Sequence, residues 1–308
     1  MRPRRPDDHF AAEARAARDA GRTVAVVDHD ALAAGDARRA VASVPADDVA
    51  VYRGWMLTSE RYAGFTAALA RRGVTARTGA EQYRRAHELP GWYPALAAHT
   101  PRSAWTTGAD RADFDRARAD LPAGAAIVRD YVKSMKHYWH EATFIPDLGD
   151  ADAAWAVAAR FRQLRDDDFT GGYVLREFES FTTAEVRTWW LDGRCVLVGP
   201  HPDTPDVPPP DGLDLGWLRP LIGALGLPFV TADLADRRGR RRAGQRPAEQ
   251  RRPGRPRRRA GRVTARSELL VYLRVAALPA PLQPADRRHL LLVQLEREHV
   301  QVLRLPLR

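Results

Sequence analysis

The stretch IVRDYVKSMKHYWHEA, residues 127–142, contains both lysines of the chain, Lys133 and Lys136. The chain has 49 Lys and Arg residues, and all the others are arginine. Two lysines three positions apart therefore indicate that a compact ammonium charge is needed there, as it is for a phosphate oxygen. The apolar residues 125–132 predict a strand that delivers Arg129 and Lys133 into a cleft. The alternative, an exposed strand end with ordinary solvated charges, fits the same residues equally well.

The two lysines are not equivalent in this interpretation. Residues 129 and 133 would share one face of the strand, whereas Lys136 would lie past its end. We therefore favour Lys133 as the phosphate ligand.

Composition limits the class of protein. At 308 residues the chain is long enough for two domains and a sizeable core. Its single cysteine, Cys195, excludes an internal disulfide framework and an all-cysteine metal site, which is typical of a reducing cytosol. No apolar run approaches the length of a membrane span, and the first residues lack the hydrophobic core of a signal peptide. We expect a soluble cytoplasmic protein without a membrane partner.

The positive charge is concentrated in one segment. The formal net charge is +10, and residues 237–266 contain 14 Arg and one Glu, a local charge of +13. The rest of the chain therefore sums to 10 − 13 = −3. Because the body is slightly acidic, the role of the basic segment is a separate question from the function of the folded part.

The first third of the chain alternates between helical and extended patterns. The predicted helices are at 10–20, 58–72 and 78–87, and the predicted strands are at 23–27, 49–52 and near Val74. Gly73 is placed to end the second helix, and Thr78 and Glu81 have the spacing of a capping box at the start of the third. Strands and helices that alternate with short connections predict an α/β domain with a largely parallel sheet.

The following part changes period. A strand at 102–106, helices at 110–120 and from Asp150, a strand at 173–178, a hairpin of 185–190 with 194–198, a helix at 214–225 and a strand at 229–234 are predicted. Asp192-Gly193 is a strong turn signal for the hairpin. In regular strands Arg176 and Glu177 face opposite sides, whereas Glu185 and Arg187 share a face.

Asp233 lies near the end of the last of these strands. A carboxylate in that place could be a metal ligand or simply a turn or cap residue.

This order of elements and motifs resembles the ATP-grasp superfamily. More narrowly it resembles the clade marked by two arginines and a lysine in the nucleotide site, to which VRDYVKS at 128–134 and EVR at 185–187 correspond. The motifs YRGWML at 52–57 and EQYRRAHELPGWYP at 81–94 are similar to the same bacterial branch. The resemblance covers about residues 5 to 235.

The resemblance implies a fold and a domain division. An N-terminal α/β domain that is pre-ATP-grasp-like, at 1–120, is expected before an α+β ATP-grasp domain at 121–235, and a tail rich in Arg and Leu at 236–308 follows.

The resemblance also implies an activity. An ATP-dependent ligase would bind ATP with Mg²⁺ and activate a small-molecule or peptide carboxylate as an acyl phosphate for attack by an amine or a thiol. Arg129 and Lys133 would neutralise phosphate charge, and Arg187 would act as the catalytic residue at the transferring phosphoryl group. The remaining residues implied for the site are Arg176, Glu177 and Glu185 for ATP and Asp233 for the metal.

Two departures from the family pattern are expected to matter. The first strand of such a domain has no counterpart ahead of the first helix, and the arginine run takes the place of a closing strand with acidic ligands. An Arg codon of the CGN type, read one base later, encodes Val, Ala, Asp, Glu or Gly. We therefore expect residues from 236 onward to be a shifted reading frame, with 237–266 extended or unpacked. Asp233 would then lack its acidic partners, and activity would be lost or reduced.

Other functions compete with the ligase interpretation. The basic segment 237–266 could bind nucleic acid through phosphate contacts without sequence specificity, and such binding would weaken steeply with salt. His137, His140 and Glu141 have a spacing that could suit a metal on a helix, but no further ligand group accompanies them. No Walker motif, dinucleotide fingerprint or nucleophile elbow is present in the sequence.

Overall fold

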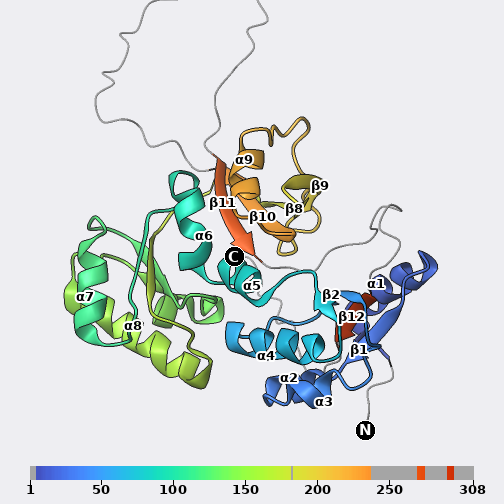
Figure 1. Ribbon diagram of the computed structural model, residues 1–308. Coiled ribbons are helices and arrows are strands. Elements are labelled where there is room, and N and C mark those ends of the chain that lie inside the picture. Colours follow the sequence, from blue (N-terminus) through green and yellow to red (C-terminus); the bar gives the residue numbers. More distant parts are fainter. Residues whose placement is uncertain (1–4, 182, 237–268, 275–289, 295–308) are drawn as a thin grey trace, which may run out of the picture.

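The computed structural model describes residues 5–181, 183–236, 269–274 and 290–294. Three four-stranded sheets organise this part of the chain, and α5 and α6 lie between them (Figure 1). We call them the N-terminal, middle and C-terminal sheets. The mixture of helices and strands confirms the predicted α/β class.

The N-terminal sheet is entirely parallel, as the alternating pattern predicted. Its strand order is β1-β12-β2-β3. Its strands are β1 (Val24–Val27), β12 (Leu290–Gln294), β2 (Val49–Arg53) and β3 (Thr75–Ala76), and its helices are α1 (Asp8–Asp19), α2 (His29–Ala33), α3 (Ala37–Ala40) and α4 (Ser59–Ala70). The Thr58 hydroxyl caps α4 by accepting from the N–H of Arg61, and Gly73 follows the helix with a φ of +73°.

Two helices connect the N-terminal sheet to the rest. They are α5 (Ala80–His87) and α6 (Leu89–Leu96), followed by the 3₁₀ turn η1 (Ala97–His99). α5 is capped one residue later than the sequence predicts, because the Gln82 side chain accepts from the N–H of Gly79. Trp92 of α6 packs in a core that includes Val174 of the middle sheet and Trp190 of the C-terminal sheet. This core joins the two sheets.

The middle sheet is antiparallel in the order β4-β7-β5-β6. Its strands are β4 (Ser103–Trp105), β7 (Val174–Glu177), β5 (Ala126–Arg129) and β6 (Phe144–Ile145). Its helical elements are α7 (Arg111–Ala119), η2 (Lys136–Tyr138), the one-turn π-helix η3 (Trp139–Thr143), α8 (Ala151–Arg165) and η4 (Asp166–Asp168). Asp110 and Asp150, where two helices are predicted to begin, cap α7 and α8 through their side chains. β4 and α7 lie before residue 120, so this sheet begins ahead of the domain boundary predicted there.

The C-terminal sheet is antiparallel in the order β11-β10-β8-β9 and carries α9 (Leu218–Ala224). Its strands are β11 (Leu269–Arg274), β10 (Phe229–Asp236), β8 (Val186–Leu191) and β9 (Arg194–Pro200). β8 and β9 form the predicted hairpin, and Asp192 and Gly193 both have positive φ, 45° and 74°, as a type I′ turn requires.

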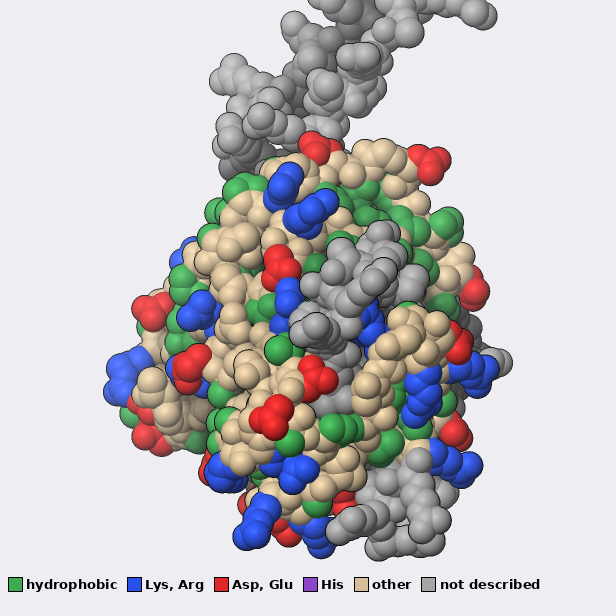
Figure 2. All heavy atoms as spheres, turned by 45° about the vertical axis from the view of Figure 1, so that its right-hand side comes forward, with side chains coloured by type: hydrophobic (Ala, Val, Ile, Leu, Met, Phe, Trp, Pro, Cys, Tyr) green, Lys and Arg blue, Asp and Glu red, His purple; other side chains and the backbone are tan. Residues whose placement is uncertain are grey.

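Two short pieces of the predicted tail are thus strands, β11 beside β10 and β12 between β1 and β2. The basic segment 237–266 lies outside the described residues, so its unpacked state and the shifted reading frame stay predictions. In the described part of the chain, no helix has both the length and the apolar character needed to cross a membrane. Figure 2 shows acidic and basic side chains interspersed over one face of the molecule.

Candidate functional site

Three predicted site residues meet on the C-terminal sheet. Arg187 of β8 and Asp233 of β10 are directly opposite across the two strands. The Arg187 Nε donates to Asp233 Oδ1 at 2.6 Å, and its Nη2 donates to Asp233 Oδ2 at 2.9 Å. Both side chains are buried, at 8% and 0% exposure. Asp233 is therefore neither a turn residue nor a cap, but one half of a buried two-point ion pair.

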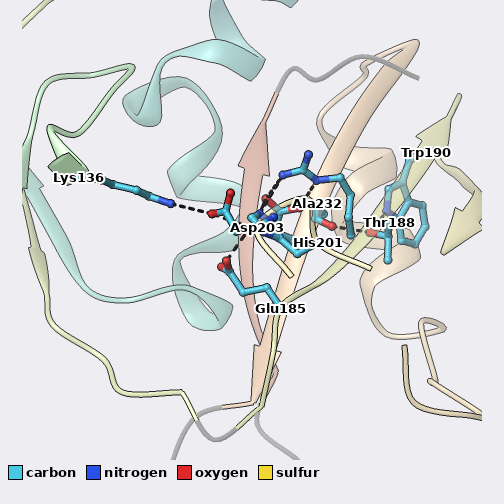
Figure 3. Close-up of polar contacts among 9 residues, drawn as sticks. Lys136, Glu185, Thr188, Trp190, His201, Asp203 and Ala232 are labelled. Atoms are coloured by element: carbon cyan, nitrogen blue, oxygen red, sulfur yellow. Dashed lines mark hydrogen bonds and ion pairs between the residues drawn. The ribbon is translucent and has the colours of Figure 1, made fainter. Parts of the chain in front are cut away.

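A histidine that the sequence did not single out completes the group. His201 follows β9, is 1% exposed, and lies with Nε2 3.0 Å from Arg187 Nη2 and 3.4 Å from Asp233 Oδ2. Glu185 lies 3.6 Å from the same nitrogen (Figure 3). We call Glu185, Arg187, His201 and Asp233 the Arg187 cluster.

The orientation of the His201 ring follows from its second nitrogen. The backbone N–H of Asp203 donates to His201 Nδ1 at 3.1 Å. The other ring nitrogen, Nε2, therefore lies between the Arg187 guanidinium and the carboxylates of Glu185 and Asp233.

The Arg187 cluster is supported from both sides. On one side, the Trp190 indole donates to the Thr188 hydroxyl and that hydroxyl donates to the Ala232 carbonyl, each at 2.8 Å (Figure 3). At its rim, Lys136 reaches Asp203 at 3.5 Å, with both side chains more than half exposed. Lys136, which we did not favour as the phosphate ligand, therefore lies near the cluster, where it makes a weak surface contact.

The anchoring strand is shorter than predicted. β5 ends at Arg129, so Arg129 and Lys133 do not share a strand face. The reason is the buried carboxylate of Asp130, whose Oδ1 accepts the N–H groups of Val132 at 2.8 Å and Lys133 at 2.5 Å. A side chain that bonds the backbone two and three residues later favours a turn over a continued strand.

Other bonds fix the same turn. Asp130 Oδ2 accepts from Arg165 Nε at 2.9 Å, and the Arg129 side chain donates to the carbonyls of Asp130 and Val132. Arg129 thus holds the turn, while the exposed Lys133 projects from it.

Lys133 lines a pocket that the sequence did not indicate. The pocket has a volume of about 130 Å³, and α2, the start of α4 and His87 close it from the N-terminal side. Burial is the main reason that the pKa of His87 is lowered to about 4, and the positive charges of Lys133 and Arg129 add to the effect. Arg187 is not among its lining residues, so Lys133 and Arg187 have different surroundings.

The two remaining predicted residues lie elsewhere on the middle sheet. Arg176, 1% exposed, donates to the Thr100 hydroxyl at 2.7 Å and lies 5.9 Å from the centre of the Trp92 ring. Glu177, 9% exposed, lies 3.9 Å from Arg102. The seven predicted residues are therefore distributed over three places, and their roles stay predictions.

The prediction that Asp233 binds a metal conflicts with its ion pair to Arg187. Both carboxylate oxygens of Asp233 accept from Arg187. Among residues 5–181, 183–236 and the two short strands, no group of three His, Cys, Asp or Glu could hold a metal ion, and Glu141 pairs with Arg160 at 2.6 Å. The described residues as arranged do not fit a protein-held metal.

Comparison with known proteins gives a direct match to one part of the chain. Residues 118–242 match the model of the family described as ATP-grasp domain, R2K clade family 3. No curated protein matches the chain in sequence.

Solved structures are similar in fold. N5-carboxyaminoimidazole synthetase from Staphylococcus aureus matches with a TM-score of 0.50 and 10% identity, over 87% of this chain and 66% of that one. A RimK domain ATP-grasp protein from Sphaerobacter thermophilus DSM 20745 has a TM-score of 0.43 and 16% identity, over 61% and 67%. The ATP-grasp ligase PsnB with a minimal precursor has a TM-score of 0.35 and 12% identity, over 56% and 55%. The chain thus spans between about half and two thirds of the length of these structures.

The family match contains the middle sheet from β5 onward, the β8–β9 hairpin and β10, which together carry Lys133 and the whole Arg187 cluster. The synthetase shares this fold. Residues 118–242 therefore resemble an ATP-grasp domain in sequence, and the fold of the chain is similar to that of an ATP-grasp synthetase.

Proposed function

We propose that the chain binds ATP in this domain and uses it to activate the carboxylate of a small molecule or peptide. An oxygen of the carboxylate attacks the γ-phosphorus and ADP leaves, which gives an acyl phosphate. An amine or a thiol then attacks the acyl carbon, and inorganic phosphate leaves. The observation that carries the proposal is that Arg187 and Asp233, on adjacent strands, and Glu185, just ahead of β8, converge within the family match.

Within the described residues, one edge of the Arg187 guanidinium is available for a phosphoryl oxygen. Its Nε and Nη2 are bonded to Asp233 and approach His201, whereas Nη1 makes no hydrogen bond to another described residue. A guanidinium held by a buried carboxylate is pre-oriented, so it does not need to reorganise as charge develops on the transferring group. The proposed chemistry needs no covalent nucleophile, because positioning and electrostatics carry phosphoryl transfer.

Lys133 supplies a second charge. Its ammonium makes no ion pair within the described part of the chain, and the Asp130 turn fixes its backbone. A compact ammonium on a rigid turn suits a phosphate oxygen. Mg²⁺ enters this proposal with the triphosphate, and no step is assigned to a protein-bound metal.

The test is ATP binding by the full chain in the presence of Mg²⁺, measured by calorimetry. Lys133→Ala should weaken binding by about 1.5–3 kcal/mol, the value of a lost charge-assisted bond. Lys136→Ala is the matched control, because it removes the only other lysine from a half-exposed surface pair and should change the affinity by less than about 1 kcal/mol.

Turnover is then tested by release of ADP when candidate carboxylates and amines are added. Absence of ATP binding by the unmodified chain would reject the proposed function. Equal affinities in the two lysine variants would reject only the role of Lys133.

A further inference from the structure

The pocket beside Lys133 joins two parts of the chain that the family match separates. Arg61 and His87 come from the N-terminal side, and Lys133 and Arg165 come from the ATP-grasp domain. Its volume of about 130 Å³ is well above the roughly 10–15 Å³ that one buried water needs. A small ionised group therefore fits in it.

The charges that face this pocket do not balance. Arg61 and Lys133 make no side-chain ion pair within the described residues, and both line the pocket. Arg165 is already paired with the buried Asp130, and Asp168, the acid in the lining, is 77% exposed and 3.9 Å from Arg165. Two cations that share one concavity and have no ion-pair partner among the described residues create a positive potential, which attracts an anion.

Polar groups of the N-terminal side add to this potential. Thr58 and Arg61 are the cap and the third residue of α4, so the first turn of this 12-residue helix lines the pocket. The partial positive charge of a helix N-terminus favours an anion in this position.

His87 is the third and independent observation. His87 lines the pocket and is only 9% exposed. No hydrogen bond joins its ring to another described residue. Its nearest ring contact is Tyr83, at 4.9 Å between centroids. A buried neutral imidazole next to two cations offers an N–H donor to an incoming anion.

We propose that this pocket is an anion-binding site for a carboxylate or phosphate group, held by Arg61 from the N-terminal side and Lys133 from the ATP-grasp domain. The N-terminal part of the chain then contributes directly to ligand binding. The anion is either a phosphate of the nucleotide or an acidic group of another molecule, and the two sources share the same chemistry.

The first measurement is calorimetric titration of the full chain with inorganic phosphate at constant ionic strength. Arg61→Ala should weaken phosphate binding about tenfold or more, because a charge-assisted contact is lost. Arg71→Ala is the control, since it removes an exposed arginine from the C-terminal cap of the same helix and should leave binding within about twofold. Circular dichroism checks that both variants are folded.

The second measurement separates the two sources. If Arg61→Ala weakens phosphate binding but leaves ATP affinity unchanged, the anion belongs to a second molecule. If it weakens both equally, the pocket holds a phosphate of the nucleotide. Phosphate binding can be measured whether or not ATP binds, so failure of the proposed function would be seen separately.

A third readout is the His87 ring, followed by NMR. Saturation with phosphate should raise the pKa of His87, because an anion in the pocket stabilises the imidazolium. No phosphate binding by the unmodified chain, or equal binding by the Arg61 and Arg71 variants, would overturn the proposal.

Discussion

Arg187 and Asp233 form a two-point ion pair across the antiparallel strands β8 and β10, with both side chains buried. Residues directly opposite in such a pair project from the same face. The register alone therefore brings the two side chains together. Because each charge has lost its water, its partner is needed to keep it stable.

A double-mutant cycle measures this dependence. Arg187→Met and Asp233→Leu should each destabilise the chain by about 3–5 kcal/mol, since each leaves one buried charge without its partner. The double variant should lose much less than the sum, and urea unfolding gives all four free energies. Additive losses would show that the two side chains do not depend on each other.

Most of the secondary structure was predictable because its signals are local. Asp110 and Asp150 start their helices where the sequence places them, and Asp192-Gly193 fixes the hairpin through two residues with positive φ. The parallel N-terminal sheet followed from strands and helices that alternate with short connections. The family resemblance is confirmed by the match over residues 118–242.

The site was less predictable because it depends on distant contacts. Glu185, Arg187 and Asp233 were each singled out from the sequence for separate roles, and the structure brings them together through strand pairing and His201. His201 comes from a proline-rich loop without a periodic pattern, so nothing in its neighbourhood identified it. The pocket at Lys133 needs residues near position 61, about seventy positions away, which no local pattern reveals.

Asp130 shows how one buried side chain overrode a strand pattern. Residues 125–132 are apolar enough for a longer strand, yet the Asp130 carboxylate bonds the N–H groups of Val132 and Lys133 and ends β5 at Arg129. Residue propensities could not predict these bonds, because the bonds depend on the burial of Asp130 against Arg165, which is distant in the sequence.

Asp130→Asn tests this role. The amide carries no charge for Arg165 to pair with, and its NH₂ group is a donor that would face other donors. We therefore expect a loss of about 3–5 kcal/mol in unfolding free energy. Asp168→Asn is the control, because Asp168 also lies near Arg165 but is 77% exposed, and it should cost less than about 1 kcal/mol. Similar losses in the two variants would contradict the special role of Asp130.

Gly193 is required by the hairpin turn. Its φ is +74°, and a Cβ there would lie 3.2 Å from Gly223 Cα. Gly193→Ala should therefore destabilise the chain by about 1–2 kcal/mol. Gly64→Ala, in the exposed middle of α4 with nothing within 4 Å of the added Cβ, should instead stabilise it by about 0.5–1 kcal/mol. Thermal unfolding of both variants decides the sign.

The last prediction concerns acid stability and His87. Its pKa is lowered from 6.5 to about 4 in the folded chain, chiefly by burial and further by Lys133 and Arg129. Between pH 4 and 6.5 the unfolded chain binds a proton here that the folded chain does not, so the free energy of unfolding falls as the pH falls through this window.

The full loss from this residue is about 3 kcal/mol at pH 4 and below. His87→Gln cannot take up the proton, so the difference between the two unfolding curves, measured in urea at each pH, isolates the histidine from the carboxylates that titrate nearby. The stability of the variant should fall less steeply from pH 6.5 to 4. Parallel curves over that range would mean that His87 is as easily protonated in the folded chain as in the unfolded one, and would contradict the lowered pKa.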